Sequence, residues 1–206
     1  MALILKGTGL ALLGHCPLEL ADGLPHDGGS LLLLGPDEPA FWPHFKASPE
    51  YSDGLPDPLD RWSRRVVGRL AGAAKGVAYY PFDGPAFRPF YTWARRSGRA
   101  WPSPIGFLVH ADRGLFVSYR GAIWVPEHHA PAHGTAPCDT CAAPCKDACP
   151  VGAFRAGYDV EACRTHIATP QGASCMTQGC AARSACPVGA GLRAPEQSAF
   201  HMEAFR

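Results

Sequence analysis

The sequence predicts a mixed α/β domain followed by a small cysteine-rich domain. Before residue 126, short apolar runs bounded by glycine and proline alternate with segments of helical periodicity, which is typical of strands and helices. Beyond that point, eight of the nine cysteines lie between Cys138 and Cys186. Residues 126–137 contain three prolines and three histidines and show little periodicity. We therefore predict domains of residues 1–132 and 133–206.

Composition excludes several classes of protein. The chain has 206 residues, of which 47% are hydrophobic, so it can bury a core. Nineteen Lys and Arg against eighteen Asp and Glu leave a formal charge of +1, which favours neither a nucleic acid nor a membrane as partner. No stretch approaches the about 20 apolar residues of a membrane span, and no signal-peptide cleavage site is recognisable. These observations predict a cytoplasmic protein.

The first elements are a strand, a loop and a helix. Residues 31–34 form a fully apolar run that suits a buried strand, and residues 36–57, rich in proline and aromatic residues, are predicted as a loop. A helix is predicted from Asp57, a candidate N-cap that Pro58 and Asp60 follow in suitable positions. Its apolar residues recur at helical spacing and predict one buried stripe: Leu59, Trp62, Val66 and Leu70. Its arginines are interpreted as a solvated face: Arg61, Arg64, Arg65 and Arg69.

The remaining elements of the first domain are mostly strands. A second helix is predicted over residues 87–97, ending at Gly98. Strands are predicted at residues 77–80, 105–110, 115–119 and 122–125. The turn at residues 111–114 would join two of these strands into a hairpin.

The cysteines form two runs that end alike. The first run has intervals of two, three and three residues and comprises Cys138, Cys141, Cys145 and Cys149. The second has intervals of eleven, four and five residues and comprises Cys163, Cys175, Cys180 and Cys186. Both final cysteines begin the sequence Cys-Pro-Val-Gly-Ala. The middle interval of the first run is one residue longer than usual, which a bulge at Ala143 or Pro144 would absorb.

This pattern predicts two four-iron four-sulfur clusters. In two-cluster ferredoxins, the cysteine before proline at the end of each run binds the other cluster. We therefore assign Cys186 to the first cluster, with Cys138, Cys141 and Cys145. Cys149 then belongs to the second, with Cys163, Cys175 and Cys180. Structural zinc is the alternative, but zinc sites lack the repeated Cys-Pro-Val-Gly turn and rarely interleave in this way.

Other residues with metal-binding side chains have simpler interpretations. Cys16 lies far from the rest and is interpreted as a small buried hydrophobe. His128, His129 and His133 are interpreted as part of a linker. His166 follows Cys163 closely and either donates a hydrogen bond to a cluster sulfur or lies on the surface.

The stretch from residue 79 to 124 is rich in aromatic side chains, which suits either a core or the lining of a flat apolar ligand. Within it, residues 102–123, PSPIGFLVHADRGLFVSYRGAI, resemble the signature of CblC-type cobalamin-processing proteins. In that signature a strand ends in His-Pro, a glycine-containing turn follows, and the return strand ends near Arg-Gly. Ala111 stands here in place of the proline.

The cysteine arrangement resembles that of epoxyqueuosine reductase and the reductive dehalogenases. Those enzymes join a cobalamin-binding, nitroreductase-like α/β domain to a two-cluster ferredoxin domain. The two resemblances together cover about residues 31–189. They imply an α/β (α+β) nitroreductase-like or CblC-like core with a C-terminal ferredoxin-like two-cluster iron–sulfur domain. The first domain is much shorter than in either enzyme family and has no clear counterpart of the reductase's general-acid aspartate.

The resemblance implies that the chain binds cobalamin beside its two clusters. The leading hypothesis is an oxidoreductase that passes electrons from the clusters to the bound corrinoid, for cobalamin reduction or upper-ligand processing, and receives them from a reduced ferredoxin or flavoprotein. The residues expected to line the pocket are Phe90, Ser103, His110, Tyr119 and Arg120. On their sequence context alone, His110 could instead be a hydrogen-bonded residue at a strand end, and Arg120 the partner of a carboxylate.

Two further hypotheses remain open. One is a reductase that acts on a second substrate, a tRNA or an organohalide, beside the corrinoid. The other is a non-enzymatic dicluster ferredoxin whose α/β domain serves for docking. A flavin could also occupy the pocket in place of cobalamin.

Overall fold

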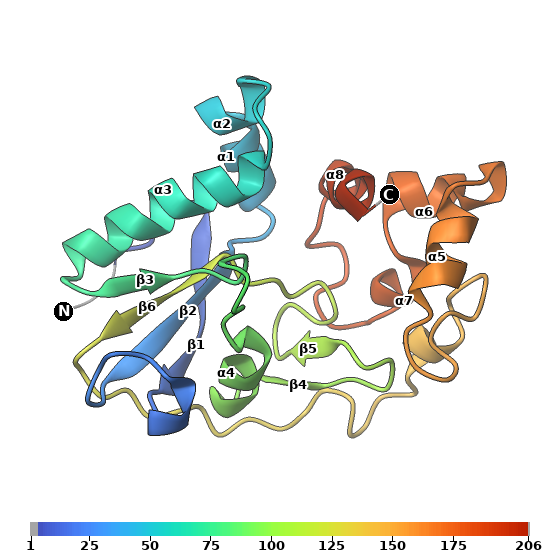
Figure 1. The fold of residues 1–206 in the computed structure, drawn as a ribbon. Helices are drawn as coiled ribbons and strands as arrows, with labels where there is room; N and C mark the ends of the chain where they lie inside the picture. The colour runs from blue at the N-terminus through green and yellow to red at the C-terminus, as the bar shows by residue number, and fades with distance from the viewer. Residues whose placement is uncertain (1–3, 206) are drawn as a thin grey trace. The chain divides into compact units, whose positions relative to one another are not determined.

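The computed structural model describes residues 4–205, which divide into two compact units (Figure 1). The first unit comprises residues up to 99 together with 118–134. The second comprises residues 100–117 together with the chain from 135 onward. From residue 135 onward the chain stays in the second unit, which agrees closely with the predicted boundary after residue 132. Residues 100–117 were predicted in the first domain but belong to the second unit, with the cysteines. In the described part of the chain, no helix is long and apolar enough to cross a membrane.

The first unit is built on a four-stranded antiparallel sheet in the order β1-β2-β6-β3. The strands are β1 (Leu10–Pro17), β2 (Ser30–Pro36), β6 (Gly121–Val125) and β3 (Val77–Tyr79). Every residue of β2 is buried. This strand is central, with Leu33 opposite Ala122 on one side and Gly14 on the other, so an uninterrupted apolar run suits it. The predicted strands at residues 31–34, 77–80 and 122–125 are thereby confirmed, whereas β1 was not predicted.

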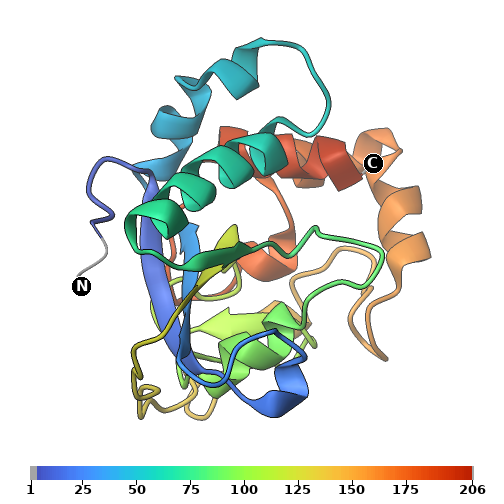
Figure 2. The same cartoon turned by 60° about the vertical axis from the view of Figure 1, so that its left-hand side comes forward.

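Two helices pack on this sheet, α3 (Pro58–Ala73) against β3 and β6, and α4 (Phe90–Arg96) against β1 (Figure 2). Asp57 stands at the N-cap position of α3 and Pro58 is the first residue of the helix, as predicted, although the Asp57 side chain makes no capping hydrogen bond. The predicted apolar stripe is confirmed, since Leu59, Trp62, Val66 and Leu70 are all buried. The short helix η1 (Leu20–Asp22) connects β1 to β2.

The prediction of a loop over residues 36–57 is wrong, because two short helices form there, α1 (Phe41–Lys46) and α2 (Pro49–Ser52). Their aromatic side chains are the cause. Phe41 and Phe45 stack on each other at 5.9 Å and meet Trp62 of α3 edge-on at 5.4 and 5.9 Å. Burying these rings against α3 favours helical turns in a segment of poor helical propensity.

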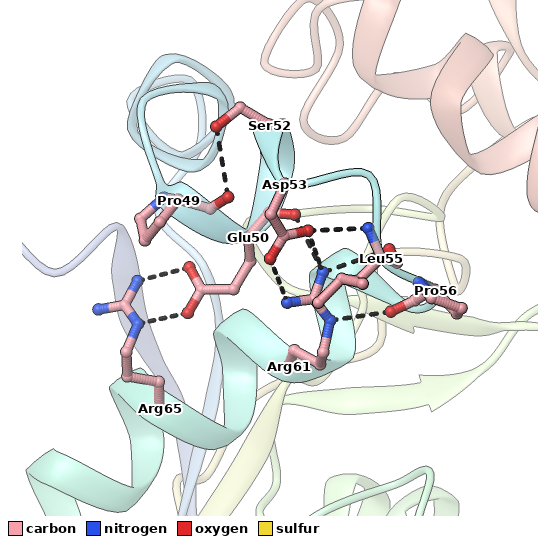
Figure 3. Close-up of polar contacts among 8 residues, drawn as sticks. All are labelled: Pro49, Glu50, Ser52, Asp53, Leu55, Pro56, Arg61 and Arg65. Atoms are coloured by element: carbon pink, nitrogen blue, oxygen red, sulfur yellow. Dashed lines mark hydrogen bonds and ion pairs between the residues drawn. The ribbon is translucent and has the colours of Figure 1, made fainter.

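Ion pairs hold the same segment to α3 (Figure 3). Arg65 binds both carboxylate oxygens of Glu50, and Arg61 binds both oxygens of Asp53 at 2.7 Å while donating to the Pro56 carbonyl at 2.8 Å. The hydrogen bond from Arg65 lowers the pKa of Glu50. The interpretation of the arginines as a solvated face is confirmed, since Arg65 is exposed and Arg61 half-exposed. The two also bind carboxylates that periodicity within α3 does not reveal.

The second unit is a β-hairpin followed by short helices. The hairpin pairs β4 (Ala100–Pro102) with β5 (Leu108–His110). The helices are η2 (Pro144–Lys146), α5 (Val160–Ile167), η3 (Pro170–Gly172), α6 (Ala173–Gln178), α7 (Ala181–Ser184) and α8 (Pro195–Phe205). The predicted strand at residues 115–119 is not formed. The chain closes a tight turn after β5, in which His110 and Gly114 exchange both backbone hydrogen bonds at 3.0 Å.

The core of the second unit combines the hairpin segment with the cysteine-rich segment. Ile105, Val109 and Leu115 pack with Cys145, Phe154 and Ala182. The cysteine-rich segment is rich in Ala, Gly and Pro and has few large apolar side chains of its own. Residues 100–117 supply apolar side chains to this shared core, which accounts for their place in this unit.

Candidate functional site

All nine cysteines are free thiols. Cys16 is fully buried in β1, and this burial raises its pKa to about 11, in agreement with its interpretation as a small buried hydrophobe. The other eight lie in the second unit, where their mutual electrostatic effects divide them into two groups.

The first group comprises Cys138, Cys141, Cys145 and Cys186. Burial raises the pKa of Cys138, and the other three thiols raise it further. Burial likewise raises the pKa of Cys145, and Cys186 and Cys141 add to this effect. Cys186 therefore belongs electrostatically with three cysteines more than forty residues before it.

The second group comprises Cys149, Cys163, Cys175 and Cys180, which line one small cavity together with Phe154 and Ile167. Burial raises the pKa of Cys175, and Cys180, Cys149 and Cys163 raise it further. The four thiols come from four places along the chain: the turn after η2, helix α5, helix α6 and the N-cap of α7. This is the grouping that the crossover assignment predicts.

Local backbone geometry explains how each run reaches its group. The extra residue of the first run is accommodated at Ala143, which adopts a left-handed conformation with φ of +53° before Pro144 begins η2. The two Cys-Pro-Val-Gly turns share a left-handed glycine, with φ of +63° at Gly152 and +70° at Gly189. The repeat seen in the sequence is therefore also a repeat of backbone conformation.

The turn after β5 packs directly on the second of these turns. A Cβ atom on Gly114 would lie 2.0 Å from the carbonyl oxygen of Val188 and 3.0 Å from Sγ of Cys186. Only glycine fits this contact, and Gly114 also has a positive φ of +54°. The segment that resembles the cobalamin signature thus helps to position Cys186.

Backbone N–H groups point at several of the sulfurs. Ala143 donates to Cys141 and Ala153 donates to Cys149, each at 3.4 Å. The amides of Ala182 and Arg183 donate to Cys180 and favour its ionised form, although burial outweighs them and raises its pKa. Such donors stabilise thiolates and the sulfurs of a bound cluster.

Aromatic side chains and one arginine surround the second group, and the sequence interpretation missed them. Phe154 and Tyr158 stack at 4.9 Å, and Phe107 meets both edge-on at 5.2 Å. Burial and a hydrogen bond with Cys163 raise the pKa of Tyr158. Arg183 acts electrostatically on Cys180. The sequence feature that could have identified Arg183 is its position three residues after Cys180, the N-cap residue of α7.

His166 lines the same cavity as the second group. Its Nε2 atom is buried and has no hydrogen-bond partner among the residues that the structure describes.

Each group supplies four cysteine thiols. Among residues 4–205, no three His, Cys, Asp or Glu side chains converge closely enough to hold one metal ion. In a four-iron cluster each iron takes one cysteine, so four thiols spaced around a cavity are the appropriate ligands.

The residues expected to bind a corrinoid divide between the two units. Phe90, Tyr119 and Arg120 belong to the first, and Ser103 and His110 to the second. Arg120 forms an ion pair with Asp60 at 3.2 Å and donates to the Tyr119 carbonyl at 3.1 Å. The carboxylate-partner interpretation of Arg120 is therefore the one that the structure supports.

Two of these residues carry buried hydroxyl groups that have no partner among the described residues, Tyr119 and Ser103. The Tyr119 ring lies 6.3 Å from that of Phe90, and burial raises the pKa of its hydroxyl. His110 is buried at the end of β5 and accepts a hydrogen bond at Nδ1 from the Asp112 amide at 3.1 Å. A buried hydroxyl without a partner is costly, so each could serve a polar ligand.

The histidines near the predicted boundary pack on the first unit. His129 stacks on His15 at 4.7 Å, and its amide donates to Ser30 Oγ at 2.8 Å.

Comparisons with protein-family models, with curated proteins and with solved structures find no match. The resemblance to cobalamin-processing proteins and epoxyqueuosine reductase stays a prediction from the residues that carry it.

Proposed function

We propose that this chain is an iron–sulfur protein that holds two four-iron four-sulfur clusters and transfers electrons. The observation that carries this proposal is the division of eight free thiols into two groups of four. Each group contains the Cys-Pro cysteine of the other run, Cys186 in one and Cys149 in the other. That interleaving is characteristic of two-cluster ferredoxins.

A bound cluster supplies one-electron transfer. The cysteines hold it, and the amides of Ala143 and Ala153 stabilise negative charge on the sulfurs of their neighbours. Ile105, Leu115 and Phe154 form part of the apolar core around the thiols and exclude water from it. Because charge, hydrogen bonds and solvent exposure set cluster potentials, these groups determine how readily each cluster accepts an electron.

The proposed electron acceptor is a corrinoid, and the proposed donor is a reduced ferredoxin or flavoprotein. The support for the corrinoid is the sequence resemblance of residues 102–123, together with the buried hydroxyl of Tyr119. The amide side chains at a corrin's edge need hydrogen-bond partners of this kind. If the chain binds no corrinoid, the proposed function is that of an electron carrier with two clusters.

Protein purified without oxygen should contain about eight irons and eight sulfides per chain, as two four-iron clusters require. Metal analysis and a sulfide assay on the same sample measure this content. Four irons, or zinc in stoichiometric amount, would contradict the assignment of the cysteines.

Hydroxocobalamin should bind at micromolar concentration, and the substitution Tyr119→Phe should weaken its binding. The change removes one buried hydroxyl and little else. If that hydroxyl serves the ligand, its loss costs about 0.5–1.5 kcal/mol, or about a twofold to tenfold rise in Kd. An anaerobic absorbance titration measures the Kd.

The matched control is Tyr91→Phe on α4, which removes an exposed phenol from the same unit and should leave Kd unchanged. A wild-type protein that binds no cobalamin at this concentration would end the corrinoid proposal and favour the dicluster carrier.

A further inference from the structure

His166 lies near the C-terminal end of α5, three residues after Cys163. Residues at this spacing lie on the same face of a helix, so the histidine and the cysteine point to the same side. The amide and the hydroxyl of Thr169 donate to the His166 carbonyl at 3.0 and 2.7 Å. A Cβ atom on Gly172 would lie 2.2 Å from this carbonyl oxygen, so the chain packs closely against it. These contacts fix the backbone that carries the imidazole ring.

The His166 side chain lines the cavity that the second cysteine group shares. Among the described residues that line this cavity, no cysteine comes from the first group, and no side chain besides His166 carries a nitrogen or an oxygen. Apart from His166 and the four cysteines, the lining is apolar and includes Phe154, Ile167 and Met202. The walls of the cavity therefore place the imidazole beside the second group.

The Nε2 atom of His166 is buried and has no hydrogen-bond partner within residues 4–205. A buried polar atom without a partner is costly, so it calls for a ligand, an ion or a water molecule. In this cavity the strong acceptors are the thiolates of the second group and the sulfides of a bound cluster. A neutral imidazole has one N–H, and these acceptors favour the tautomer that carries it on Nε2.

We propose that Nε2 of His166 donates a hydrogen bond to a sulfur of the second cluster and raises the reduction potential of that cluster. This inference rests on the proposed function. A cluster bound by four thiolates is negatively charged, and reduction adds one more negative charge. The reduced form therefore accepts the hydrogen bond more strongly, so the bond favours reduction.

Three substitutions separate the hydrogen bond from the space that the ring fills. His166→Phe keeps an aromatic ring at the cavity wall and removes the donor. His166→Gln carries an amide N–H close to the position of Nε2 and should retain most of the effect. Thr165→Val is the matched control, because Thr165 is exposed on α5 and lines an open groove with His166 but not the cysteine cavity.

The first measurement needs no substitution. Protein labelled with nitrogen-15 only in its histidines is purified without oxygen and reduced, and pulsed electron paramagnetic resonance detects nitrogen nuclei close to the unpaired electron. The wild type should show a weak coupling to a histidine nitrogen, as a hydrogen-bonded ring produces, and His166→Phe should lose it. A strong coupling, as a nitrogen bound directly to iron produces, would contradict the hydrogen bond.

A redox titration measures the effect on the potential. In His166→Phe, the ratio of reduced to oxidised second cluster at a fixed potential should fall about tenfold, which is about 59 mV for one electron. The first cluster should keep its potential, and so should both clusters of Thr165→Val. To assign the shifted signal, His166→Phe is also made in protein carrying Cys186→Ala, which should retain only the second cluster.

Iron content and far-ultraviolet circular dichroism check that each variant is loaded and folded. If His166→Phe loses iron, His166→Leu fills part of the same space without a donor and takes its place.

The two proposals fail in different ways. A wild-type protein without clusters overturns the proposed function and this inference together. A wild-type protein with two clusters overturns the inference alone if it shows no coupling to a histidine nitrogen, or if neither potential moves in His166→Phe. Equal shifts of both potentials, or the same shift in His166→Gln or Thr165→Val, would also overturn it.

Discussion

Replacing Cys186 with Ala should remove the cluster that Cys138, Cys141 and Cys145 hold, and should leave the second cluster in place. The thiol of Cys186 acts on Cys138 and Cys145 from the far end of the cysteine-rich segment. With one of four ligands absent, the iron content should fall from about eight to about four per chain. Iron analysis and paramagnetic resonance of the reduced protein measure this loss.

The reciprocal change, Cys149→Ala, should remove the second cluster although Cys149 follows Cys145 by only four residues. Its thiol lines the cavity shared with Cys163, Cys175 and Cys180. The control is Cys16→Ala, which alters a buried thiol in the first unit and should leave all eight irons bound. Loss of the cluster nearest in sequence in either variant would disprove the crossover.

The sequence predicts the elements whose burial follows a simple period. Helix α3 is predicted by its apolar stripe, by Pro58 and by Asp57 at the N-cap position. Strand β2 is predicted by an uninterrupted apolar run. Strand β1 was missed because Gly14 and the polar His15 interrupt its apolar pattern. Helices α1 and α2 were missed because their stability comes from aromatic contacts with Trp62 and ion pairs with α3, which are tertiary.

The cysteine grouping could be predicted because ligand spacing constrains it more tightly than any secondary-structure preference does. The partner of the cysteine-rich segment could not be predicted in this way. From the sequence, Ile105, Val109 and Leu115 suit the core of either domain. Their packing with Cys145, Phe154 and Ala182 places them in the second unit.

The candidate corrinoid residues show the limit of a family signature. Arg120 had two interpretations from the sequence, a ligand contact or the partner of a carboxylate, and only the tertiary fold brings Asp60 to it. Burial raises the pKa of Asp60 even with this arginine beside it. The cobalamin-type signature of residues 102–123 identifies a segment with several polar side chains. It does not identify what those side chains bind.

Removal of iron should unfold the second unit, including residues 100–117, and should leave the first unit folded. The core of the second unit contains Cys145 itself, with Phe154 as one of its few large side chains from the cysteine-rich segment. Such a core cannot readily offset the entropy of ordering the segment, so under the proposed function the energy of cluster binding contributes to its folding. The first unit has its own sheet, in which every residue of β2 is buried, and Trp62 of α3 is fully buried.

Hydrogen exchange measured by mass spectrometry, before and after chelation with oxidation, tests this expectation. Amides in β5, α5 and α6 should lose their protection by several orders of magnitude, while those in β2 and α3 keep theirs. Peptides from 100–117 are the decisive ones, because the predicted boundary at residue 132 would place them with the stable first domain and the packing of Gly114 on Val188 places them with the cysteines. Protection of these peptides that survives iron removal would show that the hairpin folds independently of the clusters.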